Sequence, residues 1–172
     1  MKNKYILVVD DEVDICEQLS GLLNDKGFES KYATSSDQAL KTFNSTQPSL
    51  VLLDIWLNNS KLDGFNTLEK FLSINNSIPI IMISGHGNIE TAVNSIKKGA
   101  YDFIEKPFDS ELLIFKIEKA LENYKLKEKI SELTRKDSES NFVCNSKSSK
   151  NLSNIIKKVS KTESSVLLTG MP

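Results

Sequence analysis

The chain has 172 residues, of which 39% are hydrophobic and 26% are charged, and its formal net charge is −1. This composition is typical of a globular protein, and no apolar run is long enough to span a bilayer, so we expect no membrane-spanning helix. No signal-peptide segment follows Met1, and Cys16 and Cys144 lie far apart without the spacing of a metal site. We therefore expect a reduced, cytoplasmic setting with no membrane contact.

The near-zero net charge hides an asymmetry along the chain. Residues 1–122 contain 12 Lys/Arg and 18 Asp/Glu, whereas residues 123–172 contain 10 and 5. The lysines of the basic part are interleaved with acidic residues, so we interpret this part as a solvated helix face rather than a nucleic-acid patch. No helix-turn-helix is discernible, and we expect no direct nucleic-acid binding by this chain.

Short apolar segments alternate with segments of helical periodicity. Those at residues 5–9, 49–56 and 79–84 show no polar alternation, which is typical of strands buried on both faces of a sheet. Shorter strands are expected at 28–33 and 102–106. Helices are expected at 12–25, after Ser35 or Ser36, from about Asp63, around 89–96 and from about Asp109. The alternation predicts an α/β fold with a doubly wound, five-stranded parallel sheet.

The long C-terminal helix carries two apolar stripes. The first can cover the sheet and consists of Leu113, Ile117, Ala120 and Tyr124. The second has spacings of four and three residues and consists of Leu126, Ile130 and Leu133. The second stripe fits either a short coiled-coil contact between two copies or a helical linker.

The polar residues 137–141 favour a domain boundary. A partial second domain is expected after it. Its short amphipathic helix would contain Leu152, Ile155, Ile156 and Val159, and a strand at 166–168 would lead into Gly170.

Polar side chains stand at the ends of four predicted strands: Asp10 and Asp11, then Asp54, Ser84 and Lys106. In a parallel sheet these carboxyl ends share one edge, where ligands bind. Crowded carboxylates repel unless a cation lies among them, and hard oxygen ligands suit Mg²⁺, which binds readily beside a phosphoryl group. The pattern predicts that Asp54 is a carboxylate nucleophile for a phosphoryl group, with Mg²⁺ and Lys106 stabilising the charge.

These residues resemble the receiver domain of two-component response regulators over residues 3–122. Ser84 follows Asp54 by 30 residues and Lys106-Pro107 follows Ser84 by 22, which is similar to the family's pattern. The resemblance implies a CheY-like, flavodoxin-like fold. It also implies a phosphoprotein in which Asp54 accepts a phosphoryl group from a sensor histidine kinase. Such a domain is no enzyme beyond the self-catalysed phosphorylation and dephosphorylation of its aspartate.

The resemblance further implies roles for individual residues. Asp11, Asp54 and the backbone carbonyl of Trp56 would bind Mg²⁺, with Asp10 helping through water. Ser84 would contact the phosphoryl group and Lys106 would pair with it. Phosphorylation would then switch the face formed by the fourth helix and fifth strand. A homodimer could form through that face or through the helix at 113–133.

Within the family, residues 54–57 and 60–64 are similar to the NtrX branch of the sigma-54 activators, so the parent protein is expected to regulate transcription. The chain departs from the family in two places. The loop before Asp63-Gly64 is longer than usual and lacks the usual proline. Phe103 stands where many receivers carry a switch tyrosine, so its ring can change position but has no hydroxyl to bond.

Two bulky side chains lie near the predicted site. Trp56 follows Asp54 by two residues and His86 follows Ser84 by two. We expect them to shield an aspartyl phosphate from water.

From about Asn141 the chain resembles the opening of the AAA+ domain of sigma-54-dependent activators, where a strand like 166–168 leads into the phosphate loop. That loop needs a later glycine, a Lys and a Ser/Thr, and none follows Gly170 in this sequence. We therefore expect a receiver domain at 3–122, a helical linker at 123–140 and an AAA+ fragment at 141–172 without ATPase activity.

Two other classes remain open on the residues alone. A haloacid-dehalogenase-like phosphatase also uses a strand-end aspartate with Mg²⁺, but it would need a second Asp where Trp56 stands. A flavodoxin-like binding module would need a glycine-rich phosphate loop after the first strand, and the chain has Asp10-Asp11 there.

Overall fold

The computed structural model describes residues 5–58, 60–85, 89–140, 151–152 and 154–156. The chain divides into two compact units, residues 1–128 and 129–172. The elements of the described chain are, in order, β1 (Tyr5–Val9), α1 (Val13–Asp25), β2 (Glu29–Ala33), α2 (Ser36–Ser45), β3 (Leu50–Asp54), α3 (Gly64–Ile74), β4 (Ile80–Ser84), α4 (Ile89–Lys97), β5 (Asp102–Glu105) and α5 (Ser110–Ser140).

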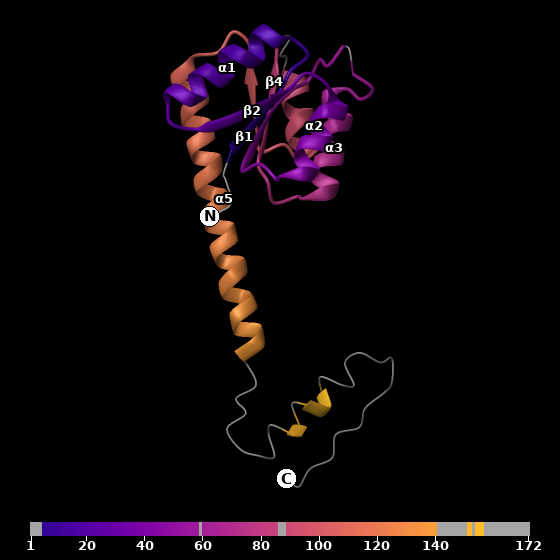
Figure 1. Ribbon diagram of the computed structural model, residues 1–172, viewed down its shortest axis with the longest axis vertical. Coiled ribbons are helices and arrows are strands. Elements are labelled where there is room, and N and C mark those ends of the chain that lie inside the picture. Colours follow the sequence, from indigo (N-terminus) through magenta and orange to yellow (C-terminus); the bar gives the residue numbers. More distant parts are fainter. Residues whose placement is uncertain (1–4, 59, 86–88, 141–150, 153, 157–172) are drawn as a thin grey trace. The chain divides into compact units, whose positions relative to one another are not determined.

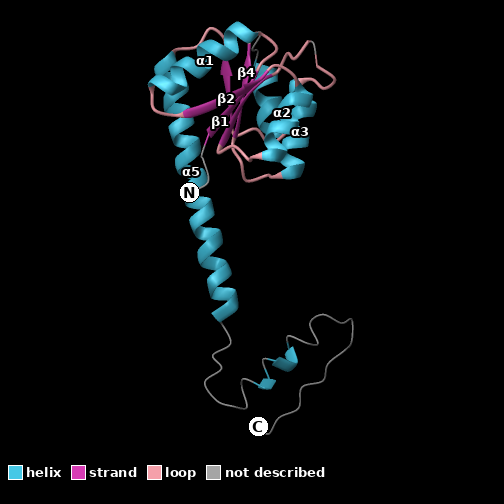
Figure 2. Cartoon of the chain, viewed as in Figure 1, coloured by secondary structure: helices cyan, strands magenta, loops and turns pink. Residues whose placement is uncertain are grey.

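The five strands form one parallel sheet in the order β2-β1-β3-β4-β5. Figure 2 shows the strands lying between helices. This confirms the predicted doubly wound α/β fold. From β1 the chain passes to β2 on one side, and β3 then returns to the other side of β1. The strand order therefore reverses between β1 and β3, and the crevice outside their carboxyl ends is where open α/β sheets bind ligands.

Alternate side chains of each central strand enter two separate cores. Tyr5, Leu7 and Val9 of β1 belong to the core under α2 and α3, whereas Ile6 and Val8 belong to the core under α1 and α5. Figure 1 shows α2 and α3 on one face of the sheet and α1 and the first part of α5 on the other. A strand buried on both faces cannot alternate polar with apolar residues, which explains the continuous apolar runs of the sequence.

The helix termini follow local capping chemistry. The side chain of Ser35 accepts a hydrogen bond from the Gln38 N–H at the start of α2, and Asp63 accepts one from the Asn66 N–H at the start of α3. Gly27 follows α1 with a φ of 82°, a conformation that glycine adopts without steric cost. The Ser35 and Asp63 caps stand in the connections after β2 and β3, whereas Glu12 before α1 makes no side-chain cap hydrogen bond.

The central strand is shorter than expected. Residues 49–56 were predicted as one strand, but β3 covers only Leu50–Asp54. The Ile55 N–H still donates to the Ile83 carbonyl, whereas the Trp56 N–H turns back and donates to the Asp54 carboxylate. The acidic side chain therefore ends the strand by competing for the next backbone donor.

The helices α4 and α5 differ in how far their predicted apolar side chains are buried. In α5 three members of the predicted stripe, Leu113, Ile117 and Ala120, are buried, and the fourth, Tyr124, is partly buried against the core under α2 and α3. In α4 the apolar side chains of Ile89 and Val93 are exposed, and Ile89 is 84% exposed. A helix with exposed apolar side chains is less firmly packed than its neighbours.

The second unit is described only in part. It includes the end of α5 and the helical residues 151–152 and 154–156. Val159, Cys144 and the strand predicted at 166–168 lie outside the described residues, as does His86 of the first unit. Within the described helices, none combines the length and the hydropathy that crossing a membrane requires.

Candidate functional site

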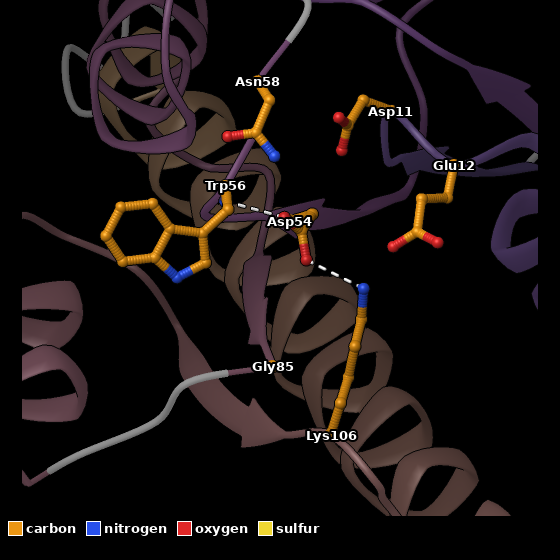
Figure 3. A pocket seen from close by; sticks show the side chains of 7 residues that line it. All are labelled: Asp11, Glu12, Asp54, Trp56, Asn58, Gly85 and Lys106. Carbon is orange, nitrogen blue, oxygen red and sulfur yellow. Dashed lines mark hydrogen bonds and ion pairs between the residues drawn. The ribbon is translucent and has the colours of Figure 1, made fainter.

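A hollow of about 560 Å³ opens at the carboxyl ends of the strands (Figure 3). Its lining comes from the loops after β1, β3 and β4 and from the end of β5. It consists of Asp11, Glu12, Asp54, Trp56, Asn58, Gly85 and Lys106. Because β1 and β3 are neighbours at the reversal of strand order, their C-terminal acidic residues are brought to the same place.

Lys106 connects two carboxylates from different strands. Its Nζ lies 2.6 Å from Oδ2 of Asp10 and 2.9 Å from Oδ1 of Asp54. Both carboxylates are buried, and the Lys106 side chain is 19% exposed. Burial lowers the pKa of Lys106, but its hydrogen bonds and attraction to these carboxylates outweigh this effect, so the pKa lies above its ordinary value. The ammonium group therefore stays charged at neutral pH.

Asp54 is held by donors on both carboxylate oxygens. Oδ1 accepts from Lys106, and Oδ2 accepts a 2.7 Å hydrogen bond from the backbone N–H of Trp56. Burial raises the pKa of Asp54 above its ordinary value, and the hydrogen bond and charge of Lys106 oppose that shift only in part. A buried carboxylate with fixed orientation is suited to nucleophilic attack.

The loop after β1 supplies the other acidic groups. Asp10 is turned inward, and its Oδ1 accepts a 3.0 Å hydrogen bond from the Glu12 N–H. Asp11 and Glu12 line the hollow instead. Figure 3 shows both carboxylates directed toward the space beside Asp54. Three acidic side chains, those of Asp11, Glu12 and Asp54, thus line one partly closed space.

The donor set suits a hard divalent ion that keeps waters. Within the described part of the chain, no group of three or more His, Cys, Asp or Glu side chains is arranged to hold a metal by itself. Mg²⁺, however, usually takes one or two carboxylates and completes its shell with water and other oxygens. Asp11 and Asp54 face the same hollow, and the carbonyl of Trp56 belongs to the same loop. These residues fit the ion.

Neither of the two predicted switch residues, Ser84 and Phe103, lines the hollow. Ser84 ends β4 and is fully buried, and its carbonyl accepts a 2.7 Å hydrogen bond from the Lys106 N–H. The next residue, Gly85, reaches the lining. Phe103 lies in β5 beside Met82 of β4, partly buried against the core under α2 and α3.

Two hydrogen bonds connect the long loop after β3 to the start of α2. The Ser36 N–H donates to Oγ of Ser60 at 3.1 Å, and the Leu62 N–H donates to Oγ of Ser36 at 3.2 Å. Ser36 is fully buried, and an exposed ion pair joins Lys61 to Asp37 at 2.8 Å. These contacts give the loop a defined conformation without the usual proline.

Sequence reasoning missed three residues of the lining: Glu12, Asn58 and Gly85. Glu12 directly follows the two predicted acids, so the acidic run itself was a usable signal. Gly85 follows the strand-end Ser84 in the same way. Asn58 had no signal, because only the path of the loop brings it to the hollow.

The comparisons with known proteins agree with this fold and site. The response regulator receiver domain family matches residues 6–118. The chain therefore belongs to the response regulator receiver family, whose fold the sheet order displays.

Within that family the chain is similar to NtrX regulators. The chain is 42% identical over 165 residues to the nitrogen assimilation regulatory protein NtrX of Azorhizobium caulinodans, covering 96% of this chain and 36% of that protein. The crystal structure of the NtrX receiver domain of Brucella abortus has a TM-score of 0.66 and 54% identity, over 68% of this chain and 98% of that one. A longer NtrX structure from Brucella abortus has a TM-score of 0.72 and 49% identity, over 90% of this chain and 34% of that one.

The similarity to NtrX continues beyond the receiver domain, since it covers nearly the whole chain. The chain nevertheless spans only about a third of the length of the curated relative, 36% of NtrX from Azorhizobium caulinodans.

Proposed function

We propose that Asp54 accepts a phosphoryl group from a sensor histidine kinase. The observation that carries the proposal is the Lys106 ammonium group, which bridges Asp10 and Asp54 at the edge of a hollow lined by further acids. A phosphoryl group carries negative charge, so a carboxylate can attack it only where cations offset the repulsion. Lys106 supplies one such charge from the protein itself.

Mg²⁺ is the second cation in this proposal. Asp11, Asp54 and the backbone carbonyl of Trp56 would hold it, with Asp10 helping through a water molecule. The bound ion would neutralise phosphoryl oxygens and so supply electrostatic stabilisation. The protein's own part is to hold the Asp54 carboxylate in a fixed orientation through Lys106 and the Trp56 N–H.

The proposed response is a change on the face formed by α4 and β5. A new phosphoryl group would compete with Asp10 for Lys106 and would attract the hydroxyl of Ser84. Ser84 leads directly toward α4, and Lys106 directly follows β5. Phe103 of β5 would then shift its ring. Two features support this: the exposed apolar side chains of α4 and the partial burial of Phe103.

The parent protein is proposed to be a cytoplasmic transcription regulator of the NtrX type. The match to NtrX extends over 96% of this chain. This supports a receiver domain at 3–122, a linker at 123–140 and the opening of an AAA+ domain at 141–172. A homodimer is proposed through the face of α4 and β5 or through residues 113–133. Leu112 and Phe115 of α5 are exposed apolar side chains that such a contact would cover.

The phosphorylation test uses a small phosphodonor. We expect that acetyl phosphate with Mg²⁺ adds one phosphoryl group to the protein and that peptide mapping places it on Asp54. Asp54→Asn should stay unlabelled, removal of Mg²⁺ with a chelator should abolish labelling, and the exposed Asp25→Asn should label like the wild type. Label on another residue, or label that persists in Asp54→Asn, contradicts the proposal. Steady turnover of a phosphate ester would instead indicate a phosphatase.

A further inference from the structure

Trp56 presents a large aromatic ring at the hollow although its neighbours are buried. Ile55 and Leu57 are 2% and 4% exposed, whereas Trp56 is 52% exposed. A Trp side chain left half in water forgoes much of the stabilisation that burial would give. An exposed aromatic ring on a well-held backbone is the usual form of a binding anchor.

The backbone around the indole is held on both sides. The Trp56 N–H donates to Asp54, the Ile55 N–H donates to Ile83, and the Gly64 N–H donates to the Ile55 carbonyl. The rest of the loop is fastened to Ser36. Because this backbone is already held in place, it loses little conformational entropy when a ligand contacts the ring. A small entropy loss favours binding.

The hollow has room for more than a phosphoryl group. Its volume of about 560 Å³ lies within the range of roughly 300–1,000 Å³ that small organic ligands occupy. In Figure 3 the carboxylates of Asp11 and Glu12 lie on one side of Asp54 and the indole lies on the other. Among the lining residues that the structure describes, Trp56 is the one aromatic side chain. The site thus offers a charged side for the phosphoryl group and an aromatic side for what carries it.

We propose that the Trp56 indole stacks on the imidazole ring of the phosphodonor and so selects phosphohistidine over donors that have no ring. This inference rests on the proposed function of Asp54. In the transfer, a carboxylate oxygen of Asp54 forms a bond to phosphorus while the phosphorus–nitrogen bond breaks. The electron pair of that bond stays on the ring nitrogen. A ring whose other nitrogen carries a proton then leaves as neutral imidazole.

The ring chemistry favours this contact. A protonated imidazole is attracted to the face of an aromatic ring, and indole is the strongest such partner among the side chains. Offset stacking of two planar rings adds to the attraction. The contact would orient the donor so that its phosphorus faces Asp54, and Trp56 would act as a specificity-determining residue.

The experiment compares three donors on one set of variants. Phosphoimidazole has the ring and the phosphorus–nitrogen bond, phosphoramidate has that bond without the ring, and acetyl phosphate has neither. Initial rates of Asp54 labelling are measured by mass spectrometry for the wild type, Trp56→Ala, Trp56→Phe and, as a control for loss of an exposed ring, Tyr32→Ala in β2.

We expect Trp56→Ala to slow labelling by phosphoimidazole roughly three- to tenfold, the size of a lost aromatic contact. Labelling by phosphoramidate and acetyl phosphate should fall less than labelling by phosphoimidazole, because neither donor has a ring for the indole to contact and the hydrogen bond to Asp54 comes from the backbone N–H of residue 56. Trp56→Phe should regain most of the loss, and Tyr32→Ala should match the wild type with every donor.

Two results overturn the inference. An equal loss with all three donors means that Trp56 supports Asp54 in general and does not recognise the ring. An unchanged preference in Trp56→Ala means that the ring is not contacted. Both leave the proposed function intact, whereas wild-type protein that none of the donors labels on Asp54 overturns the proposed function together with this inference.

Discussion

At the scale of single residues, Lys106 sets the charge balance of the site. Two carboxylates that are nearly inaccessible to water, those of Asp10 and Asp54, share its ammonium group. Removing one partner of a buried ionic group leaves the remaining charges without compensation, which costs far more than losing a surface ion pair. The arrangement that we propose receives a phosphoryl group thus also makes the fold depend on Lys106.

We therefore expect Lys106→Met to lower the free energy of unfolding by about 2–4 kcal/mol. The control is Lys116→Met, which removes a 2.6 Å ion pair with the more exposed Asp102. Its cost should be less than about 1 kcal/mol. Urea denaturation followed by circular dichroism measures both values. Similar losses for the two variants would show that the pairs are equally solvated and contradict this account.

At the scale of elements, the connection from β3 to α3 is the most constrained part of the site. Gly64 begins α3 directly against the end of β3. A Cβ there would overlap the carbonyl oxygen of Asp54 and lie 2.6 Å from Cα of Ile55. These are backbone atoms of the strand that carries Asp54, and they cannot move without displacing it. The glycine allows the helix to start this close to the strand.

Gly64→Ala is accordingly expected to destabilise the protein by at least about 3 kcal/mol and to weaken labelling of Asp54, because the strand end must shift. Gly21→Ala is the matched control. Gly21 lies inside α1 and a Cβ there meets nothing within 4 Å, so this change should raise stability by about 0.5–1 kcal/mol. Thermal denaturation of both variants decides the matter. A Gly64→Ala protein as stable as the wild type would refute the close contact.

At the scale of the whole molecule, the two hydrophobic cores lie within the first unit. All members of both clusters fall between Tyr5 and Tyr124. The first part of α5 is indispensable to this unit, because Leu113, Ile114 and Ile117 cover the sheet beside α1. Burying three such side chains contributes about 5–9 kcal/mol, which is comparable with the total stability of a domain.

A fragment of residues 1–128 is expected to fold alone, with a melting temperature within about 5 °C of the full chain and with normal labelling of Asp54. A fragment of residues 1–109, which lacks α5, is expected to be largely unfolded. Circular dichroism melts of both fragments test this. If the 1–109 fragment melted like the full chain, the assignment of α5 to the core would be wrong.

Much of the fold was predictable from local pattern. The continuous apolar runs of β1, β3 and β4 show burial on both faces, and the helical segments between them require crossover connections. The parallel sheet follows from these two facts. The end of β3 was less predictable, because the Trp56 N–H donates to the Asp54 carboxylate instead of continuing the strand, although the sequence stays apolar there.

The sequence by itself determined the class of fold, the family and the strand ends at which Asp10, Asp11, Asp54, Ser84 and Lys106 stand. Tertiary structure alone decided that Lys106 bridges Asp10 and Asp54, that Ser36 fastens the loop after β3, and that Trp56 stands in the hollow while its neighbours are buried. The reason is physical. Burial periodicity is encoded locally, whereas contacts between side chains 52 or 96 residues apart depend on sheet order, register and loop path, which no single segment contains.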